Sequence, residues 1–128
     1  MPNVLCLLNH ELTEKQRIEL SNGYAVDEIL VPPPALKTLW ASIPTGESLS
    51  RSIFSPIVHW LGDTSRSGDY LVIQGEFGAT FFLIEYAFAQ HLIPLHSVTK
   101  RIAQETRVAE IVYRSYVFEH IRFRRYIQ

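Results

Sequence analysis

Polar residues stand directly after the first apolar run of the sequence, at a position where chemistry is possible. Asn9 and His10 follow the run VLCLL, residues 4–8. A histidine at such a place can act as a general acid or base, or donate a hydrogen bond to a phosphate. The alternative is a capping or partly buried polar group without a chemical role, and the residues alone leave both interpretations open.

The stretch QGEFGAT, residues 74–80, follows the apolar run DYLVI and precedes a long apolar segment. It matches neither the Walker loop nor the dinucleotide fingerprint. Backbone N–H groups at the start of the next helix could still hold a phosphate or a polar ligand edge, although Glu76 would oppose a phosphate by its like charge. Alternatively, Gly75 and Gly78 only allow the turn and the helix to pack closely.

Lys100 and Arg101 are adjacent, so on an extended strand their side chains point to opposite sides. Ser97 and Thr99 lie just before them. One of the two cations could therefore face an anionic ligand together with these hydroxyl groups.

Near the end of the chain, His120, Arg122 and Arg124 alternate, and strand alternation predicts that all three lie on one face. Such a face suits an anion or a polyphosphate. The alternative is an exposed edge strand that its charges protect against pairing. The five histidines are dispersed, and no HExxH or Cys/His spacing indicates a metal site.

The elements that must position these residues alternate between strands and helices. Short apolar runs predict strands at residues 4–8, 28–31, 70–73 and 92–95, and period-two alternation predicts strands from residue 108 onward. Helices are expected at residues 13–22, 35–43, 48–61 and 79–91, with Pro56 kinking or breaking the third. This order predicts an α/β fold with a mainly parallel sheet flanked by helices and a C-terminal antiparallel strand or hairpin. Ligands bind beyond the carboxyl ends of such strands, so the polar strand ends should gather at one edge.

Length, net charge and cysteine content limit the classes of protein to which this chain can belong. The 128 residues fit one domain, residues 1–128, and the formal net charge of −1 excludes a general DNA binder or a protein of anionic membranes. Cys6 is the single cysteine, so no internal disulfide forms, and its apolar surroundings predict a buried, inert thiol. No apolar stretch approaches the ~20 residues that cross a bilayer, and no secretory leader is recognisable. We expect a cytoplasmic protein.

Five segments together resemble a known family: LLNHELTEKQ, LWASIP, GDYLVIQGEFGATFFLIEYAF, LIPLHSVTKR and VFEHIRFRRY. They are similar, in the same order and over nearly the whole chain, to the small stand-alone Csx-type accessory proteins of type III CRISPR systems. These are related to the CARF (CRISPR-associated Rossmann fold) proteins and are proposed to be ring nucleases. The resemblance implies a Rossmann-like, CARF-like fold, a homodimer and a cyclic oligoadenylate ligand, with cyclic tetra-adenylate as the expected ring.

The activity that the resemblance implies is cleavage of the ring into linear adenylates, which switches off an antiviral signal. No metal or cofactor is needed, because the ribose 2′-hydroxyl attacks the neighbouring phosphodiester and leaves a 2′,3′-cyclic phosphate. His10 would then protonate the leaving oxygen, Lys100 and Arg101 would offset developing charge, and Glu76 would accept from a ribose or adenine group or act as a base. The catalytic candidates are His10, Lys100 and Glu76.

The same resemblance implies a set of ligand contacts through hydroxyl, amide, backbone and cationic groups. The candidate contacts are Asn9, Gln74, Gly75, Phe77, Gly78, Thr80, Ser97, Thr99, Arg101, His120 and Arg122.

Two other functions remain open from the sequence. A sensor or sponge that binds the ring without cutting it would use the same residues. A regulatory subunit without a small ligand would instead place Lys100, Arg101 and His120 on separate surfaces.

Overall fold

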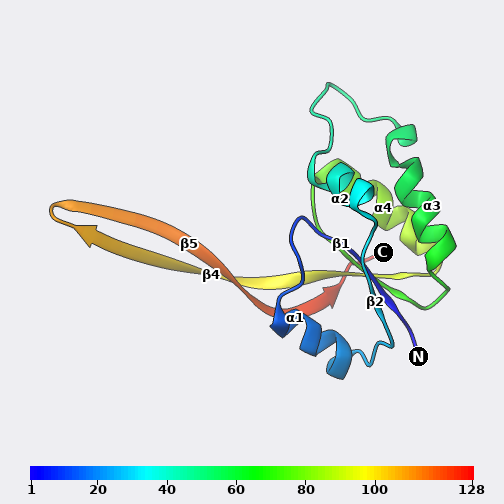
Figure 1. The fold of residues 1–128 in the computed structure, drawn as a ribbon, viewed down its shortest axis with the longest axis horizontal. Coiled ribbons are helices and arrows are strands. Elements are labelled where there is room, and N and C mark those ends of the chain that lie inside the picture. The colour runs from blue at the N-terminus through cyan, green and yellow to red at the C-terminus, as the bar shows by residue number, and fades with distance from the viewer.

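A five-stranded mixed sheet organises the chain, and the computed structural model describes residues 1–128 (Figure 1). The strands are β1 (Val4–Leu7), β2 (Ile29–Leu30), β3 (Tyr70–Ile73), β4 (Ile93–Val108) and β5 (Ile111–Arg125). They lie in the order β2-β1-β3-β4-β5; the first four are parallel, and β5 is antiparallel to β4. The predicted mainly parallel α/β sheet with a C-terminal antiparallel hairpin is thus confirmed, and its order reverses between β1 and β3.

Local sequence signals explain where the helices begin. α1 (Glu14–Ile18) starts with a capping box, in which the Thr13 hydroxyl accepts from the Gln16 N–H and the Gln16 side chain accepts from the Thr13 N–H. A π-helical segment, η1 (Glu19–Gly23), continues it. α2 (Pro34–Ala41) and α4 (Phe77–Ala89) match two more predicted helices closely. The predicted helix 48–61 is divided into a 3₁₀ turn, η2 (Arg51–Phe54), and α3 (Ser55–Thr64), because Pro56 suits the first turn of a new helix.

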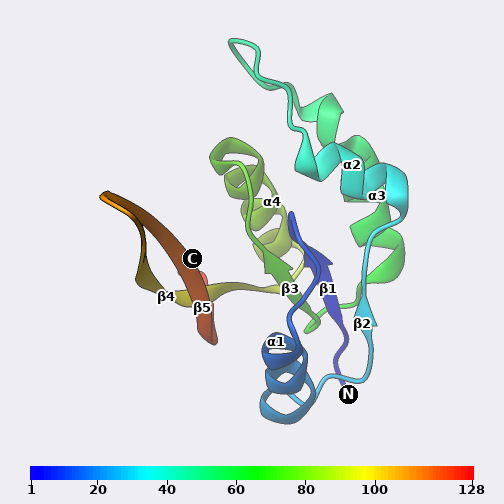
Figure 2. The same cartoon turned by 60° about the vertical axis from the view of Figure 1, so that its left-hand side comes forward.

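Helices cover both faces of the sheet, and each face has its own core (Figure 2). On one face, Leu5, Leu71 and Ile73 pack with Trp40 of α2, with α3 and with α4. The opposite face, which α1 and η1 cover, buries Cys6 beside residues such as Leu20 and Phe123. β1 is buried on both faces, which accounts for its continuous apolar run. No helix is long and apolar enough to cross a membrane.

Beyond the sheet, β4 and β5 continue as a two-stranded ribbon that projects from the body (Figures 1 and 2). We call residues 99–119 the arm. A turn at Ala109, whose φ is +54°, joins its strands. The strand predicted at 92–95 is confirmed as the start of β4, but the prediction that it ends there and gives way to a separate polar segment is wrong. β4 runs on to Val108, and its polar residues pair with β5 while staying exposed on both faces.

A β-bulge at the root of the arm overturns the predicted alternation of His120, Arg122 and Arg124. Val98 pairs with Arg122 but the next residue, Thr99, pairs with His120, so Ile121 is an extra residue in β5. His120 consequently faces α1 and is buried, whereas both arginines are exposed. The three residues do not share a face.

Candidate functional site

The carboxyl ends of the strands open into three cavities. The largest, of about 790 Å³, lies between α4 and the end of β5, and we call it the α4 cavity. A second, the His10 cavity, of about 420 Å³, lies beyond β1 and β2. Between the ends of β1 and β3 a shallower cavity of about 480 Å³ contains Asn9 and Glu76. The ends of β1 and β3 therefore meet as predicted. From the third expected set, residues 97–101, the Ser97 N–H bonds the Gln74 side chain, while the residues after it continue with β4 into the arm.

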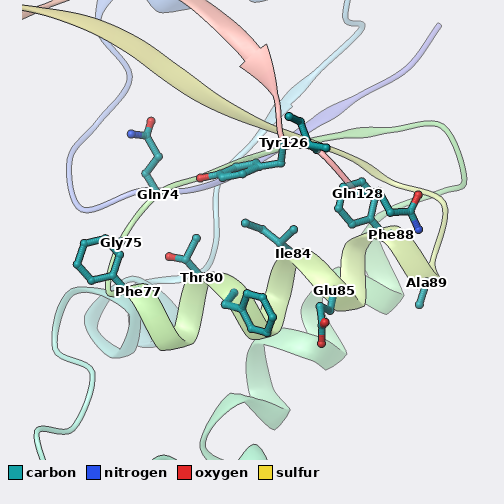
Figure 3. A pocket seen from close by; sticks show the side chains of 12 residues that line it. Gln74, Gly75, Phe77, Thr80, Ile84, Glu85, Phe88, Ala89, Tyr126 and Gln128 are labelled. Carbon is teal, nitrogen blue, oxygen red and sulfur yellow. The ribbon is translucent and has the colours of Figure 1, made fainter.

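Aromatic side chains dominate the α4 cavity (Figure 3). Phe77 and Phe81 of α4 are 93% and 65% exposed, which is unusual for phenylalanine. Tyr126 forms the opposite wall, and its hydroxyl donates to the carbonyl of Ile73 at 2.6 Å. Burial raises the pKa of Tyr126, so the phenol keeps its proton and this anchor at neutral pH. Phe88 and Ile84 complete an apolar lining that suits a flat ring system.

A few polar groups enter the same cavity, as ligand sites require. The Gln74 carbonyl oxygen of the side chain accepts from the Ser97 N–H at 2.7 Å, which fixes the amide and leaves its NH₂ group as a donor for a ligand. The Thr80 hydroxyl oxygen is buried without a hydrogen-bond partner. Gln74, Gly75, Phe77 and Thr80, all expected as ligand contacts, therefore share one cavity.

Packing explains Gly75. A β-carbon at this position would lie 2.8 Å from the Trp40 ring, whose Nε1 donates to the backbone carbonyl of Gln74 at 3.1 Å. The glycine is thus required by the close approach of Trp40 to the end of β3, which is the packing alternative raised by its sequence. For Gly78, a β-carbon would come within 3.2 Å of the Glu76 carboxylate, so the space there is also tight.

The Glu76 side chain binds the backbone N–H groups at the start of α4, which were candidates for holding a phosphate. Its carboxylate caps α4 and accepts from the N–H groups of Gly78 and Ala79. Of the two interpretations left open by the sequence, the one in which these N–H groups hold a ligand is therefore not met, because the N-cap side chain already bonds them.

Three cations line one face of β4 and β5, next to the α4 cavity. In the register, Arg124 pairs with His96 and Arg122 with Val98, and Lys100 follows Val98 by two residues on the same face. We call Lys100, Arg122 and Arg124 the basic row. Tyr126 follows Arg124 by two residues, so the aromatic wall of the cavity continues into this row.

His96 belongs to this face as well, and sequence reasoning missed it. Its ring lies 4.8 Å from the Tyr126 ring, centre to centre. Burial, and then the charge of Arg124, lower the pKa of His96 below 6.5, so the imidazole is neutral at neutral pH. A histidine within the segment LIPLHSV gave no signal of its own, because its surroundings come from β5 and not from neighbouring sequence.

On the opposite face, His120 is part of a buried network and is not available to a ligand. One ring nitrogen, Nδ1, hydrogen-bonds the Ser97 hydroxyl, and Nε2 lies 2.6 Å from Oε1 of Glu19. The other carboxylate oxygen of Glu19 accepts from the Phe123 N–H at 2.8 Å. Ser97 and His120 line none of the cavities. Glu19 could not be found from the sequence, because nothing there links η1 to a strand 101 residues away.

The remaining candidates are dispersed. Thr99 is exposed at the bulge, and the Arg101 guanidinium lies 3.7 Å from the centre of the Tyr116 ring, on the face opposite Lys100. Lys100 thus lies on the face opposite Arg101 and His120, whereas the ligand-free regulatory alternative expected all three on separate surfaces.

The second cavity contains His10, whose Nδ1 hydrogen-bonds the Glu11 carbonyl at 2.7 Å, together with two cations not foreseen from the sequence, Arg17 and Lys37. Cys6 lies against it, and burial raises its pKa to about 12, as expected of an inert thiol.

The three catalytic candidates do not meet in one chain. His10 and Glu76 line different cavities, and Lys100 belongs to the basic row. No group of three or more histidine, cysteine or carboxylate side chains is close enough to hold a metal ion.

Comparison with known proteins gives a family without a function. The model of the uncharacterized MJ1673 family matches residues 2–124. An uncharacterized protein of Methanocaldococcus jannaschii, MJ1673, is 35% identical over 126 residues, which cover 98% of each chain. No solved structure matches.

Proposed function

This chain belongs to the uncharacterized MJ1673 family, and we propose that it is a metal-independent ring nuclease for cyclic oligoadenylate, in the first instance cyclic tetra-adenylate. Its α/β sheet would then be a variant of the CARF-like arrangement, and its role would be to switch off type III CRISPR signalling. The observation that carries the proposal is that Tyr126, which forms one wall of the aromatic α4 cavity, contacts the ring of His96 and follows Arg124 of the basic row by two residues.

Adenine bases fit the α4 cavity by their chemistry. Each base can stack on an aromatic ring, and such stacking contributes about 1–3 kcal/mol per base. Phe77, Phe81 and Tyr126 offer rings from two elements, α4 and the end of β5. The Gln74 amide can donate to a ring nitrogen of the base.

Phosphates fit the basic row. Lys100, Arg122 and Arg124 are exposed on one face, in a chain whose net charge is −1, so the positive potential is local. Glu119 lies opposite Lys100 in the register but pairs with Lys15 at 3.4 Å. Charge-assisted hydrogen bonds from such groups are the strong contacts of nucleotide sites.

For cleavage, we assign Lys100 the stabilisation of negative charge that develops at the attacked phosphorus. His96 is the imidazole on this face and is neutral, so it suits the removal of the proton from the attacking 2′-hydroxyl. His10 and Glu76 line other cavities, and in this scheme they act only from the second copy of a homodimer. Binding without cleavage, as in a sensor or sponge, is the alternative.

The test is incubation with cyclic tetra-adenylate in excess chelator, followed by mass spectrometry of the products. Linear adenylates with 2′,3′-cyclic phosphate ends are expected. Tight binding with the ring intact would favour the sensor, the absence of binding would exclude both functions, and a loss of cleavage on adding chelator would exclude the metal-free mechanism.

Matched variants then test the assignment of residues. Lys100→Ala should slow cleavage by about 10²–10³-fold, the usual effect of losing one group that stabilises the transition state. Arg101→Ala is the control, because Arg101 is adjacent but lies on the opposite face. His96→Gln should slow cleavage and remove its dependence on a group that titrates below pH 6.5. If both variants cleave at the rate of the unchanged protein, the site lies elsewhere.

A further inference from the structure

The His10 cavity is separate from the α4 cavity and the basic row, and it has the position of a ligand site. It opens beyond β1 and β2, where Leu8 and Asn9 follow one strand and Val31 and Pro32 follow the other. The carboxyl ends of neighbouring parallel strands are the common place for a ligand in such sheets. The volume of about 420 Å³ lies within the ~300–1,000 Å³ that is usual for small-molecule sites.

Two cations from different helices reach this cavity without a partner in the chain. Arg17 belongs to α1 and Lys37 to α2, and these helices cover opposite faces of the sheet (Figure 2). Neither side chain forms an ion pair, whereas Lys15, two residues before Arg17, pairs with Glu119 at 3.4 Å. The fold therefore brings two unpaired positive charges to the end of β1, which indicates an anionic ligand.

Arg17 lies near the floor of the cavity, because its charge acts on Cys6. Burial raises the pKa of the Cys6 thiol to about 12, and the charge of Arg17 opposes that rise. Such an effect requires the guanidinium to lie near the thiol, which lines the same cavity. Glu11 is the single carboxylate among the lining residues, so the two cations leave the cavity with a net positive charge.

The hydrogen bond of His10 decides what its ring offers to a ligand. Nδ1 lies 2.7 Å from the carbonyl oxygen of Glu11, and since a carbonyl oxygen can only accept, Nδ1 carries the proton. In the neutral ring Nε2 is then an acceptor, which suits a hydroxyl group of the ligand. The polar groups together therefore describe a ligand with an anionic group for the cations and a hydroxyl group for His10.

An apolar wall completes the cavity, and the volume limits the size of the ligand. Leu8, Leu12 and Val31 form this wall, and Val31 is 51% exposed although its side chain is apolar. The cavity has about half the volume of the α4 cavity, 420 Å³ against 790 Å³. It therefore suits a single nucleotide or a sugar phosphate and not a ring of four nucleotides.

We propose that the His10 cavity binds a small phosphate monoester that carries hydroxyl groups, of the size of a sugar phosphate or a mononucleotide. Arg17 and Lys37 hold the phosphate from two sides, and His10 accepts from a hydroxyl group. The apolar wall packs against the organic part of the ligand. This site does not depend on the one proposed for cyclic tetra-adenylate.

Titration calorimetry with ribose 5-phosphate, adenosine monophosphate, inorganic phosphate and adenosine tests the class of ligand. At least one of the two esters should bind with a dissociation constant below about 1 mM. Inorganic phosphate should bind about 10-fold more weakly or less, because it lacks the organic part, and adenosine should not bind. Binding of both esters would identify the sugar phosphate as sufficient, and binding of the nucleotide alone would show that the base is required. The absence of binding by both esters, or equal binding of inorganic phosphate, would exclude the proposal.

Matched variants test the two cations. Arg17→Gln and Lys37→Gln should each weaken binding of the ester by about 10-fold or more, the usual effect of losing a charge-assisted hydrogen bond. Lys15→Gln is the control, because it removes the same charge from α1 outside the cavity, and it should change the affinity by about twofold or less. Circular dichroism should show all three variants folded, since these side chains are exposed. Equal losses in all three variants would mean that only net charge matters and would overturn the site.

Two further variants separate this site from the basic row and test His10. His10→Phe should weaken binding of the ester by about 3- to 10-fold and leave inorganic phosphate nearly unchanged, because it removes only the contact to the hydroxyl group. The double variant Arg122→Ala, Arg124→Ala should keep the affinity for the ester. A loss of binding in that double variant would place the phosphate in the basic row and overturn the proposal. These measurements contain no cyclic oligoadenylate, so the ring nuclease and the phosphate ester site can fail independently.

Discussion

At the root of the arm, both faces of β4 and β5 carry polar and charged side chains, but these are buried on one face and exposed on the other. On the α1 face, Ser97 and His120 are buried with Glu19 in a closed network. The α4 face leaves Arg122 and Arg124 exposed beside an open aromatic cavity. Residue type alone therefore does not decide between a structural and a ligand-binding role; the covering element does, since η1 supplies a carboxylate on one side only.

Removing that carboxylate should have the largest effect. Glu19→Ala leaves the His120 ring, 4% exposed as a side chain, and the Phe123 N–H without their partner. We expect a loss of about 3 kcal/mol in the free energy of unfolding, measured by urea denaturation. Binding of cyclic tetra-adenylate to the folded fraction should not change.

Glu119→Ala is the control for that substitution. Glu119 also pairs with a cation, Lys15, but both side chains are more than half exposed, at 51% and 56%. Such pairs contribute about 0–1 kcal/mol, so the change should be small. Equal losses in the free energy of unfolding for Glu19→Ala and Glu119→Ala would contradict the view that the buried network on the α1 face is what stabilises the fold.

On the α4 face, substitutions should change the affinity for the ligand more than the free energy of unfolding. The double variant Arg122→Ala, Arg124→Ala should keep the free energy of unfolding within about 0.5 kcal/mol, because both side chains are exposed. Its affinity for cyclic tetra-adenylate should fall about 10- to 100-fold, and the salt dependence of binding should become shallower. Titration calorimetry at two salt concentrations measures both.

The matched control uses two arginines of the arm, Arg107 and Arg114, which lie on the face opposite Lys100. Arg107→Ala, Arg114→Ala removes the same charge away from the cavity and should leave the affinity nearly unchanged. An equal loss in both double variants would mean that only net charge matters, and the basic row would lose its role.

The smallest expected effect is the pH dependence of stability that His96 contributes on the α4 face. The pKa of His96 in the folded protein is below its ordinary 6.5, so as the pH falls below 6.5 the unfolded chain takes up this proton first. Stability contributed by neutral His96 is therefore complete above about pH 6.5 and is lost as the pH falls through the folded value. His96→Gln should reduce the difference in melting temperature between pH 7 and pH 5. An unchanged difference would show that His96 does not titrate in this way.

Much of the body could be predicted because its signals are local. The strand at Tyr70–Ile73 forms and is buried from Leu71 onward, the capping box at Thr13 forms, and Pro56 lies in the first turn of α3. Each of these depends on a few neighbouring residues and on whether a face is covered.

The arm and the candidate site depended on pairing between distant residues, which the sequence does not display. β4 beyond residue 98 has neither face buried, so its pattern predicted no strand. His120 was placed on the wrong face because one extra residue, Ile121, breaks the alternation. The α4 cavity was found in part through Gln74 and Thr80, but its far wall, Tyr126, comes from the residue that follows the last strand.

The extra residue at Ile121 also gives the arm a mechanical property. A bulge bends its strand and increases its twist, so this position sets the angle between the body and an arm of roughly 30 Å. A difference of about 20° in that angle, the size of one interstrand twist, displaces the tip by roughly 10 Å. Insertions or deletions of single residues here would therefore re-aim the whole arm, while the folded body stays as it is.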